Sequence, residues 1–367
     1  MISLTWHRAN LAPILQRCLA AHPTPPDLVA ASRGPGMVSS LAVGLDTAKG
    51  LAVAWGVPFL GVHHMQAHAL TPRMCAALDG EEGPRFPFLT FLVSGGHTML
   101  LLSEGLTSHK ILAETMDVAV GDMVDKCARL VVPAEVLESE GAAVAYGAVL
   151  ERFAFPGGEA YWRYNALKTE GRRAEDAEKK KRWGDWNLGV PLTHNPKSHF
   201  KESFSFCGLG SAVERYVEKF AETITVEERR ALGREVLMVA FEHLASRVVI
   251  ALNEMPAEER VNVKSLVVSG GVASNRFLRH LMKEYLINAG FAQIELVTPP
   301  PKFCTDNAAM IGWVGLEMYR EGWTSELSVG PIRKWGLDES KVDKYGVKGG
   351  VLGVDGWKAI EGTEEGQ

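Results

Sequence analysis

The stretch VKSLVVSGGVASNRFLRHLMKEYLINAG, residues 263–290, decides the fold class. It begins with a short apolar run that is typical of a buried strand, and Gly270 and Gly271 end that run. Apolar residues at helical spacing follow, up to a stop at Gly290. The string VSGG also occurs at residues 93–96, again directly after an apolar strand. Strands that alternate with helices predict an α/β protein.

The alternation continues outward in both directions. Thr225 and Glu228 form a capping box ahead of a long helix that runs to about Glu254. The spacing predicts other helices over residues 8–22, 34–56 (after a Gly/Pro turn), 114–130, 140–153 and 306–322, and strands over 25–32, 57–62 and 291–300, with a hairpin over 86–105. Residues 155–200 indicate a poorly packed insertion, and residues 340–367 a loose, Gly-rich tail.

The composition is that of an ordinary globular protein with 367 residues, 46% hydrophobic residues, 23% charged residues and a net charge of −5. At roughly 100–200 residues per domain, this length predicts two domains or one large one. A net negative charge excludes a globally basic nucleic-acid coat, so any nucleic-acid contact needs a local patch. The basic and aromatic run at 163–182 is one candidate, although its acidic neighbours favour a solvated insertion.

The sequence predicts neither a membrane-spanning segment nor a disulfide framework. No stretch reaches 18 consecutive apolar residues, so we expect no membrane span. The five cysteines are scattered and form no CxxC pair, which argues against a disulfide framework and a thiolate zinc site. We therefore expect each of them to be a small buried apolar residue: Cys18, Cys75, Cys127, Cys207 and Cys304.

HHMQAH, residues 63–68, is a candidate metal motif. His64 and His68 are four residues apart, so on a helix both imidazoles lie on one face, where they can chelate one metal ion. A pair of structural or solvated histidines explains the spacing equally well. Asp306 can supply a third ligand, or it can simply cap the helix that follows it. His63 is the weaker candidate because it points elsewhere on the helix.

The glycine pairs are candidate anion sites, because backbone N–H groups can approach a phosphate closely at such a turn. Asn275, in the first turn of the following helix, can bind a ribose or phosphate, and a tight turn without a ligand is the alternative. Neither turn matches GxGxxG or GxxxxGK[ST]. Asp122 and Asp125 share a helix face, and either bind sugar hydroxyls or a cation or form a solvated face with Lys126 and Arg129.

Taken together, these strings resemble the motif series of the TsaD family, the tRNA N6-adenosine threonylcarbamoyltransferases once described as glycoproteases. The matching strings are HHMQAH (63–68), FLVSGGHT (91–98), VDK (124–126), FSFCGL (204–209), VVSGGVASNR (267–276) and FCTDNAAMI (303–311), with GPGM (34–37) and RKWGLDE (333–339). The resemblance covers about residues 7–340 outside the insertion. Two of the strings, HHMQAH and VSGGHT, are similar to those of the bacterial and mitochondrial branch.

The resemblance implies an actin/Hsp70-like ATPase (ASKHA) fold, with two ribonuclease-H-like lobes around a cleft. Lobe one would comprise residues 1–89 and about 307–325, and lobe two residues 90–306. The implied reaction transfers threonylcarbamoyl from threonylcarbamoyl-AMP to N6 of adenosine 37 in tRNAs that read codons beginning with A. An adenylate-forming synthase is the implied pathway partner. The branch implies a mitochondrial homodimer with no membrane association.

The family's site residues carry over motif by motif. The implied metal ligands, for one iron or zinc ion per subunit, are His64, His68 and Asp306. The implied substrate-binding residues are Val93, Ser94, Gly95, Gly96 and His97, with Thr98, on the phosphate side, Asp125 at the ribose or threonyl group, Gly147 beside it, and Asn275 at the nucleotide. No residue is implied as the base that takes the proton from the adenine amine.

The sequence departs from the family pattern in several places. Residues 131–154 replace the usual Gly-Gly segment, Gly210 stands where the family has Lys, and Gln66 where many members have Glu. The family's opening strands and their phosphate-facing loop are also missing from the sequence, which predicts a first lobe that is incomplete at its N-terminus. A truncated relative that keeps the binding cleft without turnover is therefore one alternative. A metallopeptidase is another, although HHMQAH lacks the Glu of HExxH.

Overall fold

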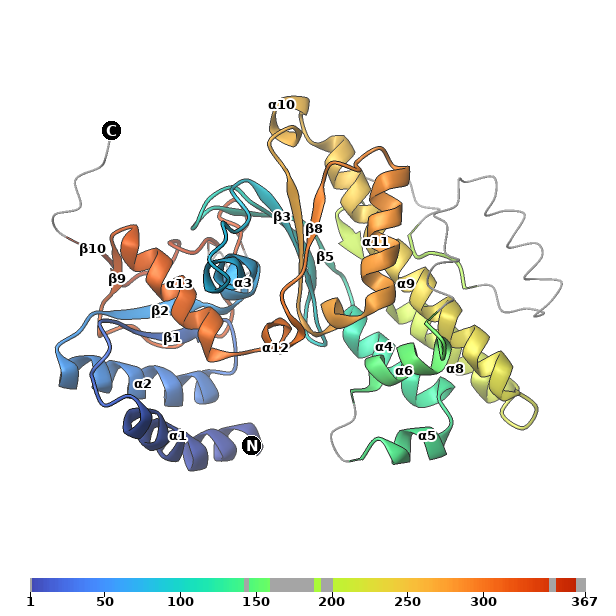
Figure 1. Cartoon of the computed structure of the whole chain (residues 1–367), viewed down its shortest axis with the longest axis horizontal. Helices are drawn as coiled ribbons and strands as arrows, with labels where there is room; N and C mark the ends of the chain where they lie inside the picture. The colour runs from blue at the N-terminus through green and yellow to red at the C-terminus, as the bar shows by residue number, and fades with distance from the viewer. Residues whose placement is uncertain (1, 142–144, 159–187, 193–200, 343–347, 361–367) are drawn as a thin grey trace. The chain divides into compact units, whose positions relative to one another are not determined.

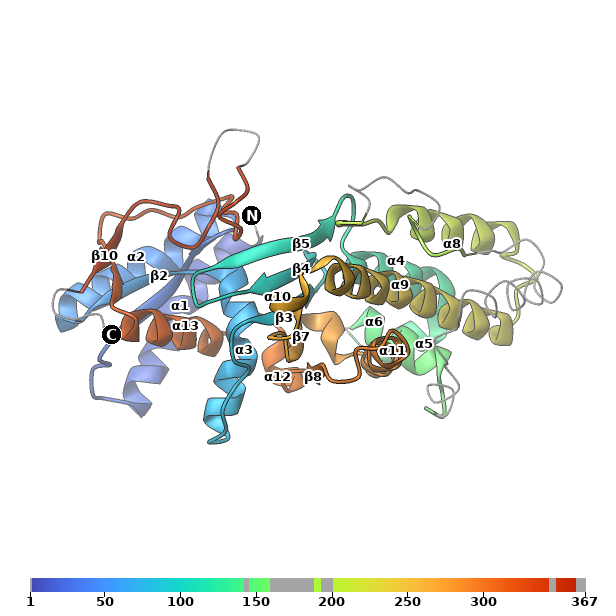
Figure 2. The ribbon, with the colours of Figure 1, turned by 90° about the horizontal axis from the view of Figure 1, so that it is seen from above.

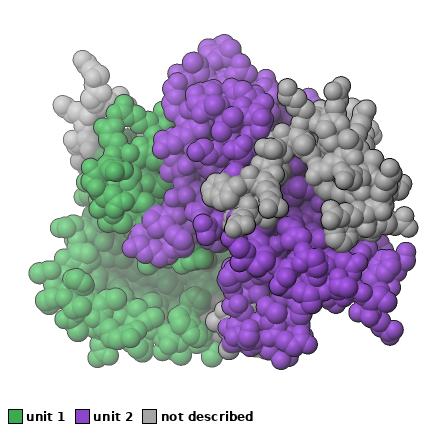
Figure 3. All heavy atoms as spheres, turned by 45° about the vertical axis from the view of Figure 1, so that its right-hand side comes forward, with its two compact units in different colours: residues 1–86, 102–110, 305–367 green, residues 87–101, 111–304 purple. Residues whose placement is uncertain are grey.

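The computed structural model describes residues 2–141, 145–158, 188–192, 201–342 and 348–360 (Figure 1). The chain divides into two compact units, which Figure 3 colours separately. Unit 1 comprises residues 1–86, 102–110 and 305–367, and unit 2 comprises residues 87–101 and 111–304. Both units contain strands and helices, so the predicted α/β class is confirmed.

Unit 2 is built on a six-stranded sheet of order β6-β5-β4-β3-β7-β8 (Figure 2). Its strands are β3 (Phe88–Val93), β4 (Thr98–Ser103), β5 (His109–Thr115), β6 (Ser203–Phe204), β7 (Ser265–Ser269) and β8 (Glu295–Val297). Strand β7 runs parallel to both β3 and β8, and Leu92 lies opposite Ser269. Every residue of β3 and β7 is buried, as expected for apolar runs in the middle of a sheet. The two VSGG strings therefore leave neighbouring parallel strands at the same edge.

The larger helices of unit 2 gather on one side of this sheet (Figure 1). They are α4 (Val120–Val131), α6 (Tyr146–Ala154), α8 (Cys207–Lys219), α9 (Val226–Glu254) and α11 (Arg276–Asn288), and the shorter elements are α5 (Ala134–Ser139), α10 (Ala257–Arg260), the 3-10 helix η3 (Gly271–Ser274) and α12 (Pro301–Cys304). The predicted capping box of α9 is confirmed. Thr225 Oγ1 accepts a hydrogen bond from Glu228 N at 3.2 Å, and the Glu228 carboxylate accepts one from Thr225 N at 2.8 Å.

Unit 1 contains the parallel pair β1 (Val29–Gly34) and β2 (Phe59–His63), and the antiparallel pair β9 (Trp323–Ser325) and β10 (Trp357–Ala359). Its helices are α1 (Ile2–Ala21), α2 (Val38–Trp55), α3 (His64–Leu78) and α13 (Ala308–Arg320). Helix α13 packs closely on β1, since a Cβ at Gly315 would lie 2.6 Å from Ala30 Cβ. A buried cluster joins α2, β2 and the segment after β9: Leu45, Ala48, Ala52, Phe59 and Val329.

Several predicted elements differ from the structure, among them the helix predicted over 140–153, which begins at Tyr146. The helix expected from residue 114 begins at Val120, because Glu114 and Thr115 belong to β5 and pair with the short strand β6. That pairing joins residues almost ninety positions apart, which local spacing cannot reveal. The segment after residue 340 was expected to be loose, yet β10 pairs with β9 and Val351 is fully buried.

The prediction that all five cysteines are buried is also wrong. Cys127 and Cys304 are buried, Cys75 is half-buried, and Cys18 and Cys207 are exposed; none of these five described cysteines forms a disulfide. Burial raises the pKa of Cys127 to about 12. The basic run at 163–182, and most of the expected insertion, lie outside the described residues. Of the helices that the structure describes, none has the length and apolar content needed to span a membrane.

Candidate functional site

Helix α3 begins at His64 because His63 caps it. His63 Nδ1 accepts hydrogen bonds from Met65 N at 3.2 Å and Gln66 N at 3.4 Å. Its other nitrogen, Nε2, lies 3.1 Å from the carbonyl oxygen of Trp335 and donates to it. Burial lowers the pKa of His63 to about 3, so the ring is neutral with its proton on Nε2. His63 therefore fixes the start of the helix that carries the candidate metal ligands.

The structure brings the three predicted metal ligands together in unit 1. Asp306 Oδ1 lies 3.0 Å from His68 Nε2 and 3.4 Å from His64 Nε2. The two imidazole rings have centroids 4.7 Å apart and are nearly perpendicular. One ligand atom from each residue lies within 4.8 Å of the others. The i, i+4 pair is thus completed by a carboxylate that is far away in the sequence.

Asp306 is free for this role because its neighbour caps the next helix. The cap of α13 is Asn307, whose Oδ1 accepts a hydrogen bond from Met310 N at 3.0 Å. The alternative of Asp306 as a helix cap is therefore wrong. Hydrogen bonds from His64, and then from His68, hold the pKa of Asp306 well below its ordinary range. Its side chain remains 78% exposed, so the carboxylate is accessible.

The donor set of this cluster fits a transition metal ion. Two imidazole nitrogens and one carboxylate oxygen are ligands that zinc and non-haem iron both accept, and three protein ligands leave a position open for substrate. The buried Nδ1 of His68 has no hydrogen-bond partner in the part of the chain that the structure describes.

Gln66, between the histidines, is fully buried and donates through Nε2 to the carbonyl of Leu106 at 2.8 Å.

The first glycine turn, residues 94–97, joins β3 to β4 in unit 2. Ser94 Oγ accepts hydrogen bonds from His97 N at 3.0 Å and Gly96 N at 3.3 Å, which fixes the turn. Gly95, Gly96 and His97 are exposed. Within the described residues, the N–H of Gly95 has no hydrogen-bond partner, and its nitrogen packs near Gly121, where a Cβ would lie 2.8 Å away. Thr98, by contrast, is buried and its Oγ1 accepts from Val120 N at 2.8 Å, which anchors the start of α4.

The second glycine turn is closed by the protein's own oxygen atoms. Gly270 has φ +102°, and a Cβ there would lie 2.3 Å from the carbonyl oxygen of Val93. Asn275 is buried, and its Oδ1 accepts from Leu278 N at 3.0 Å as the cap of α11. Glu151 Oε1 accepts from Arg276 N at 2.8 Å and from Phe277 N at 3.1 Å. The first N–H groups of α11 therefore donate to the Glu151 carboxylate of the protein itself.

Asp125 and Gly147 meet in unit 2. Asp125 Oδ1 accepts a hydrogen bond from Gly147 N at 2.9 Å, which joins α4 to α6. Burial raises the pKa of Asp125, and the bond from Gly147 opposes that rise only in part. Asp122, one helical turn earlier, pairs instead with Lys126 at 2.8 Å on the surface. The two aspartates therefore lie in different surroundings. Asp122 belongs to the solvated face of α4, and Asp125 points toward α6.

Two acidic residues at this end of unit 2 were not anticipated from the sequence. Asp117 binds the FSFCGL string through Ser205 Oγ at 2.6 Å and Phe206 N at 2.9 Å. Partial burial raises the pKa of Asp117, but hydrogen bonds from Cys207, Ser205 and Phe206 together outweigh it, so the pKa is lowered. Glu151, on α6, fixes the start of α11. Both partners are distant in the chain, so neither contact left a local signal in the sequence.

The sequence model of the family described as "TsaD: tRNA N6-adenosine threonylcarbamoyltransferase" matches residues 2–313. A mitochondrial tRNA N6-adenosine threonylcarbamoyltransferase from Schizosaccharomyces pombe is 38% identical, over 96% of this chain and 75% of that protein. Enzymes of the same name from Paramagnetospirillum magneticum and Bartonella tribocorum are 33% and 32% identical, over 85% and 88% of this chain and 76% and 77% of their own.

Among solved structures, HypF from T. kodakarensis matches 81% of this chain and 41% of its own, with a TM-score of 0.46 and 14% identity. So distant a likeness assigns no function.

Proposed function

The chain belongs to the TsaD family of tRNA N6-adenosine threonylcarbamoyltransferases, and from that premise we propose that it modifies adenosine in tRNA. The proposed reaction transfers threonylcarbamoyl from threonylcarbamoyl-AMP to N6 of adenosine 37 in tRNAs that read codons beginning with A. The amine attacks the carbamoyl carbon, the bond to the phosphate oxygen breaks, AMP leaves and N6 loses a proton. The observation that carries the proposal is the meeting of His64, His68 and Asp306 in a chain that matches this family.

In this proposal His64, His68 and Asp306 hold one iron or zinc ion per subunit. A bound ion of this kind polarises a carbonyl or phosphoryl oxygen as a Lewis acid. The protein's own contribution is to place the ligands: His63 fixes the first residue of α3, and the helical repeat sets His68 on the same face as His64. Asn307 caps α13 and so leaves the Asp306 carboxylate to the histidines.

The proposed adenylate contacts lie in unit 2. The unpaired amide of Gly95 would donate to the phosphate, while Ser94 holds the turn in shape. Donors that are already in place stabilise the charge that grows on a leaving phosphate without further reorganisation. Asp125, with one oxygen on Gly147 N, offers its second oxygen to ribose or threonyl hydroxyls. Val93 and Asn275, which the resemblance implied as further contacts, pack against Gly270 and cap α11 respectively, so we propose no direct adenylate contact for them.

We further assign units 1 and 2 to the two lobes of the ASKHA fold, although residues 102–110, expected in lobe two, and residues 326–367 belong to unit 1. A mitochondrial location is supported by the Schizosaccharomyces pombe relative, although bacterial relatives are also similar. We also propose that the protein forms a homodimer and that an adenylate-forming synthase is its pathway partner. The metallopeptidase alternative is disfavoured because Met65 stands at the position of the Glu in HExxH, and neither it nor Gln66 can act as a general base.

The test is reconstitution with tRNA, ATP, threonine, bicarbonate and the adenylate-forming synthase, with nucleoside mass spectrometry as readout. We expect threonylcarbamoyladenosine to form, and the double variant His64→Ala/His68→Ala to lose both bound metal and product. A matched control removes two exposed histidines, His7→Ala/His22→Ala, and keeps both. Unchanged metal content in the first variant would overturn the ligand assignment. Peptide hydrolysis without tRNA modification would overturn the function.

A further inference from the structure

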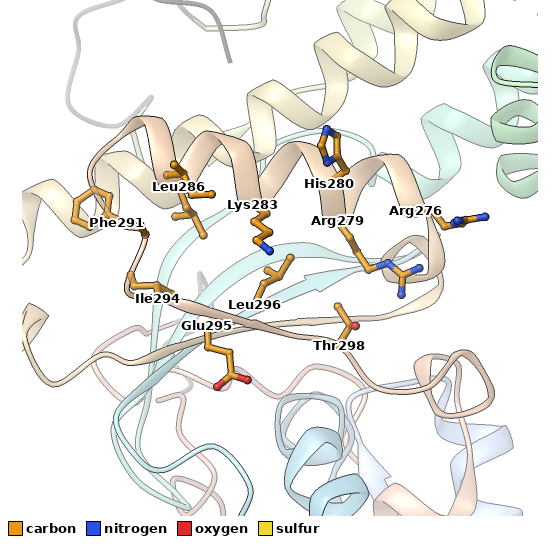
Figure 4. A pocket seen from close by; sticks show the side chains of 12 residues that line it. Arg276, Arg279, His280, Lys283, Leu286, Phe291, Ile294, Glu295, Leu296 and Thr298 are labelled. Atoms are coloured by element: carbon orange, nitrogen blue, oxygen red, sulfur yellow. The ribbon is translucent and has the colours of Figure 1, made fainter. Parts of the chain in front are cut away.

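A cavity of about 580 Å³ in unit 2 lies between α11 and the edge strand β8 (Figure 4). Helix α11 lines it with Arg276, Arg279 and Lys283, which are spaced i, i+3 and i+7 and so share a helix face. At a rise of about 1.5 Å per residue, this row is roughly 10 Å long. Its far end is apolar, with Leu286 and Phe291. The cavity therefore has a basic end near the second glycine turn and an apolar end.

Figure 4 shows how the side chains lie in this cavity. Arg279 and Lys283 reach from α11 toward β8, and Leu296 and Thr298 point back toward the helix. Glu295, the one carboxylate in the lining, points away from them. This direction follows from the alternation of side chains along a strand, which puts Glu295 on the opposite face from Leu296. The two cationic groups therefore meet no carboxylate in the cavity.

No neighbouring carboxylate neutralises the charges of Arg279 and Lys283 in the part of unit 2 that the structure describes. Elsewhere in unit 2, Lys126 pairs with Asp122 at 2.8 Å and Arg152 with Glu140 at 2.6 Å. Among the described residues, by contrast, the side chains of Arg279 and Lys283 form neither an ion pair nor a hydrogen bond. Two uncompensated cations in a concave surface attract anions, because such a surface focuses their field.

We propose that this cavity binds the phosphodiester backbone of the tRNA substrate, a proposal that rests on the proposed function. A chain with net charge −5 must contact RNA through a local basic patch, and this row is such a patch. A row of cations fits a polyanion better than a single phosphate. It also begins beside the proposed adenylate contacts, because α11 follows directly on the turn that packs Gly270 against Val93.

The test compares two double variants that remove the same charge. Arg279→Gln/Lys283→Gln removes the cavity cations, and Arg215→Gln/Lys219→Gln removes two exposed cations on α8. Affinity for an unmodified tRNA transcript is measured at several salt concentrations. We expect the cavity variant to bind on the order of tenfold more weakly, and its salt slope to fall by about 1 to 2, because each phosphate contact contributes nearly one. The α8 variant should keep the wild-type slope.

Kinetics separate this inference from the proposed function. In the cavity variant we expect a higher KM for tRNA, with kcat, metal content and KM for the adenylate unchanged. Arg279→Lys/Lys283→Arg keeps both charges and should bind tRNA as the wild type does. If the double Gln variant misfolds, Lys283→Gln alone changes one exposed side chain and should lower the slope by about 1.

Wild-type tRNA affinity and salt slope in the cavity variant, with the wild-type enzyme active, would overturn the inference and leave the proposed function standing. An altered oligomeric state with unchanged tRNA binding would make the cavity a protein interface, which also overturns it. A wild-type enzyme that binds tRNA through this cavity but forms no product would instead contradict the proposed function.

Discussion

The two glycine turns of unit 2 share the string VSGG and follow neighbouring parallel strands, yet they differ in what they leave open. In the first turn, Ser94 is partly exposed, and Gly95 and Gly96 are exposed. In the second, the corresponding residues are Ser269, which is fully buried, and Gly270, which packs its backbone against Val93. Glu151 then takes up the donors of the helix start. The same string can therefore be a ligand surface or a structural joint, and its surroundings decide which.

The largest expected difference between the turns is in glycine tolerance. Gly270→Ala places a Cβ 2.3 Å from a carbonyl oxygen at φ +102°, so we expect a loss of about 3 kcal/mol or more in the free energy of unfolding. Gly95→Ala meets no atom within 4 Å, and should change stability by less than about 0.5 kcal/mol. Denaturant unfolding of both variants measures the contrast. Equal losses in the two variants would remove the distinction between an open and a closed turn.

A second contrast concerns the carboxylate that closes the second turn. Glu151→Ala leaves the N–H groups of Arg276 and Phe277 without their buried acceptor, which we expect to cost about 2 kcal/mol in unfolding free energy. Glu151→Gln keeps an acceptor oxygen and should lose less. If Glu151→Ala were as stable as the wild type and bound AMP more tightly, the second turn would be an anion site that Glu151 merely occupies.

This closed turn also marks where sequence reasoning succeeded and where it stopped. The strand, the glycine break and the helix were predictable from residues 263–290 because apolar period and glycine act locally. The capping box at Thr225 was predictable for the same reason. Glu151 was not, because its partners lie 125 residues away. Local rules thus predict the elements, while the contacts that open or close a site form between distant segments.

The candidate metal cluster also shows that local sequence patterns predict only part of a site. The i, i+4 spacing of His64 and His68 is a local signal, but on spacing alone a structural pair was equally acceptable. Asp306 was open as a third ligand or as a helix cap, and only the family resemblance favoured the ligand, since 238 positions separate it from His68. In the structure Asn307, and not Asp306, caps α13, and the carboxylate of Asp306 turns to the histidines, which supports our proposal that the three side chains hold a metal ion.

A third prediction compares the polar side chain that fixes each turn. Asn275→Ala removes the cap of α11 and should lower the unfolding free energy by about 1 kcal/mol, as lost caps generally do. Ser94→Ala removes an acceptor at an exposed turn, where water replaces it, so a smaller loss in stability is expected. Its main effect should be a higher KM for the adenylate, measured in the reconstituted reaction. A KM effect confined to Asn275→Ala would reverse the roles of the turns.

The smallest effect on stability is expected on α4, the helix beneath the open turn, where Gly121 N donates to the carbonyl of Ser94. Asp122→Asn breaks only an exposed pair with Lys126, so stability should change by less than about 0.5 kcal/mol and KM should not change. Asp125→Asn keeps an acceptor for Gly147 N, and it removes a carboxylate whose charged form burial disfavours.

The pKa of Asp125 predicts how the stability of Asp125→Asn compares with that of the wild type as pH changes. Because the pKa of Asp125 is raised in the folded protein above its ordinary value of 3.8, its stabilising contribution is complete below that value. The contribution is lost as pH rises through the raised pKa, so at neutral pH the Asn variant should be at least as stable as the wild type. Its affinity for the adenylate should nevertheless fall, since one charged oxygen is gone. A variant that lost stability at neutral pH and kept its adenylate KM would place Asp125 among the structural residues, with Glu151, and not with the open turn.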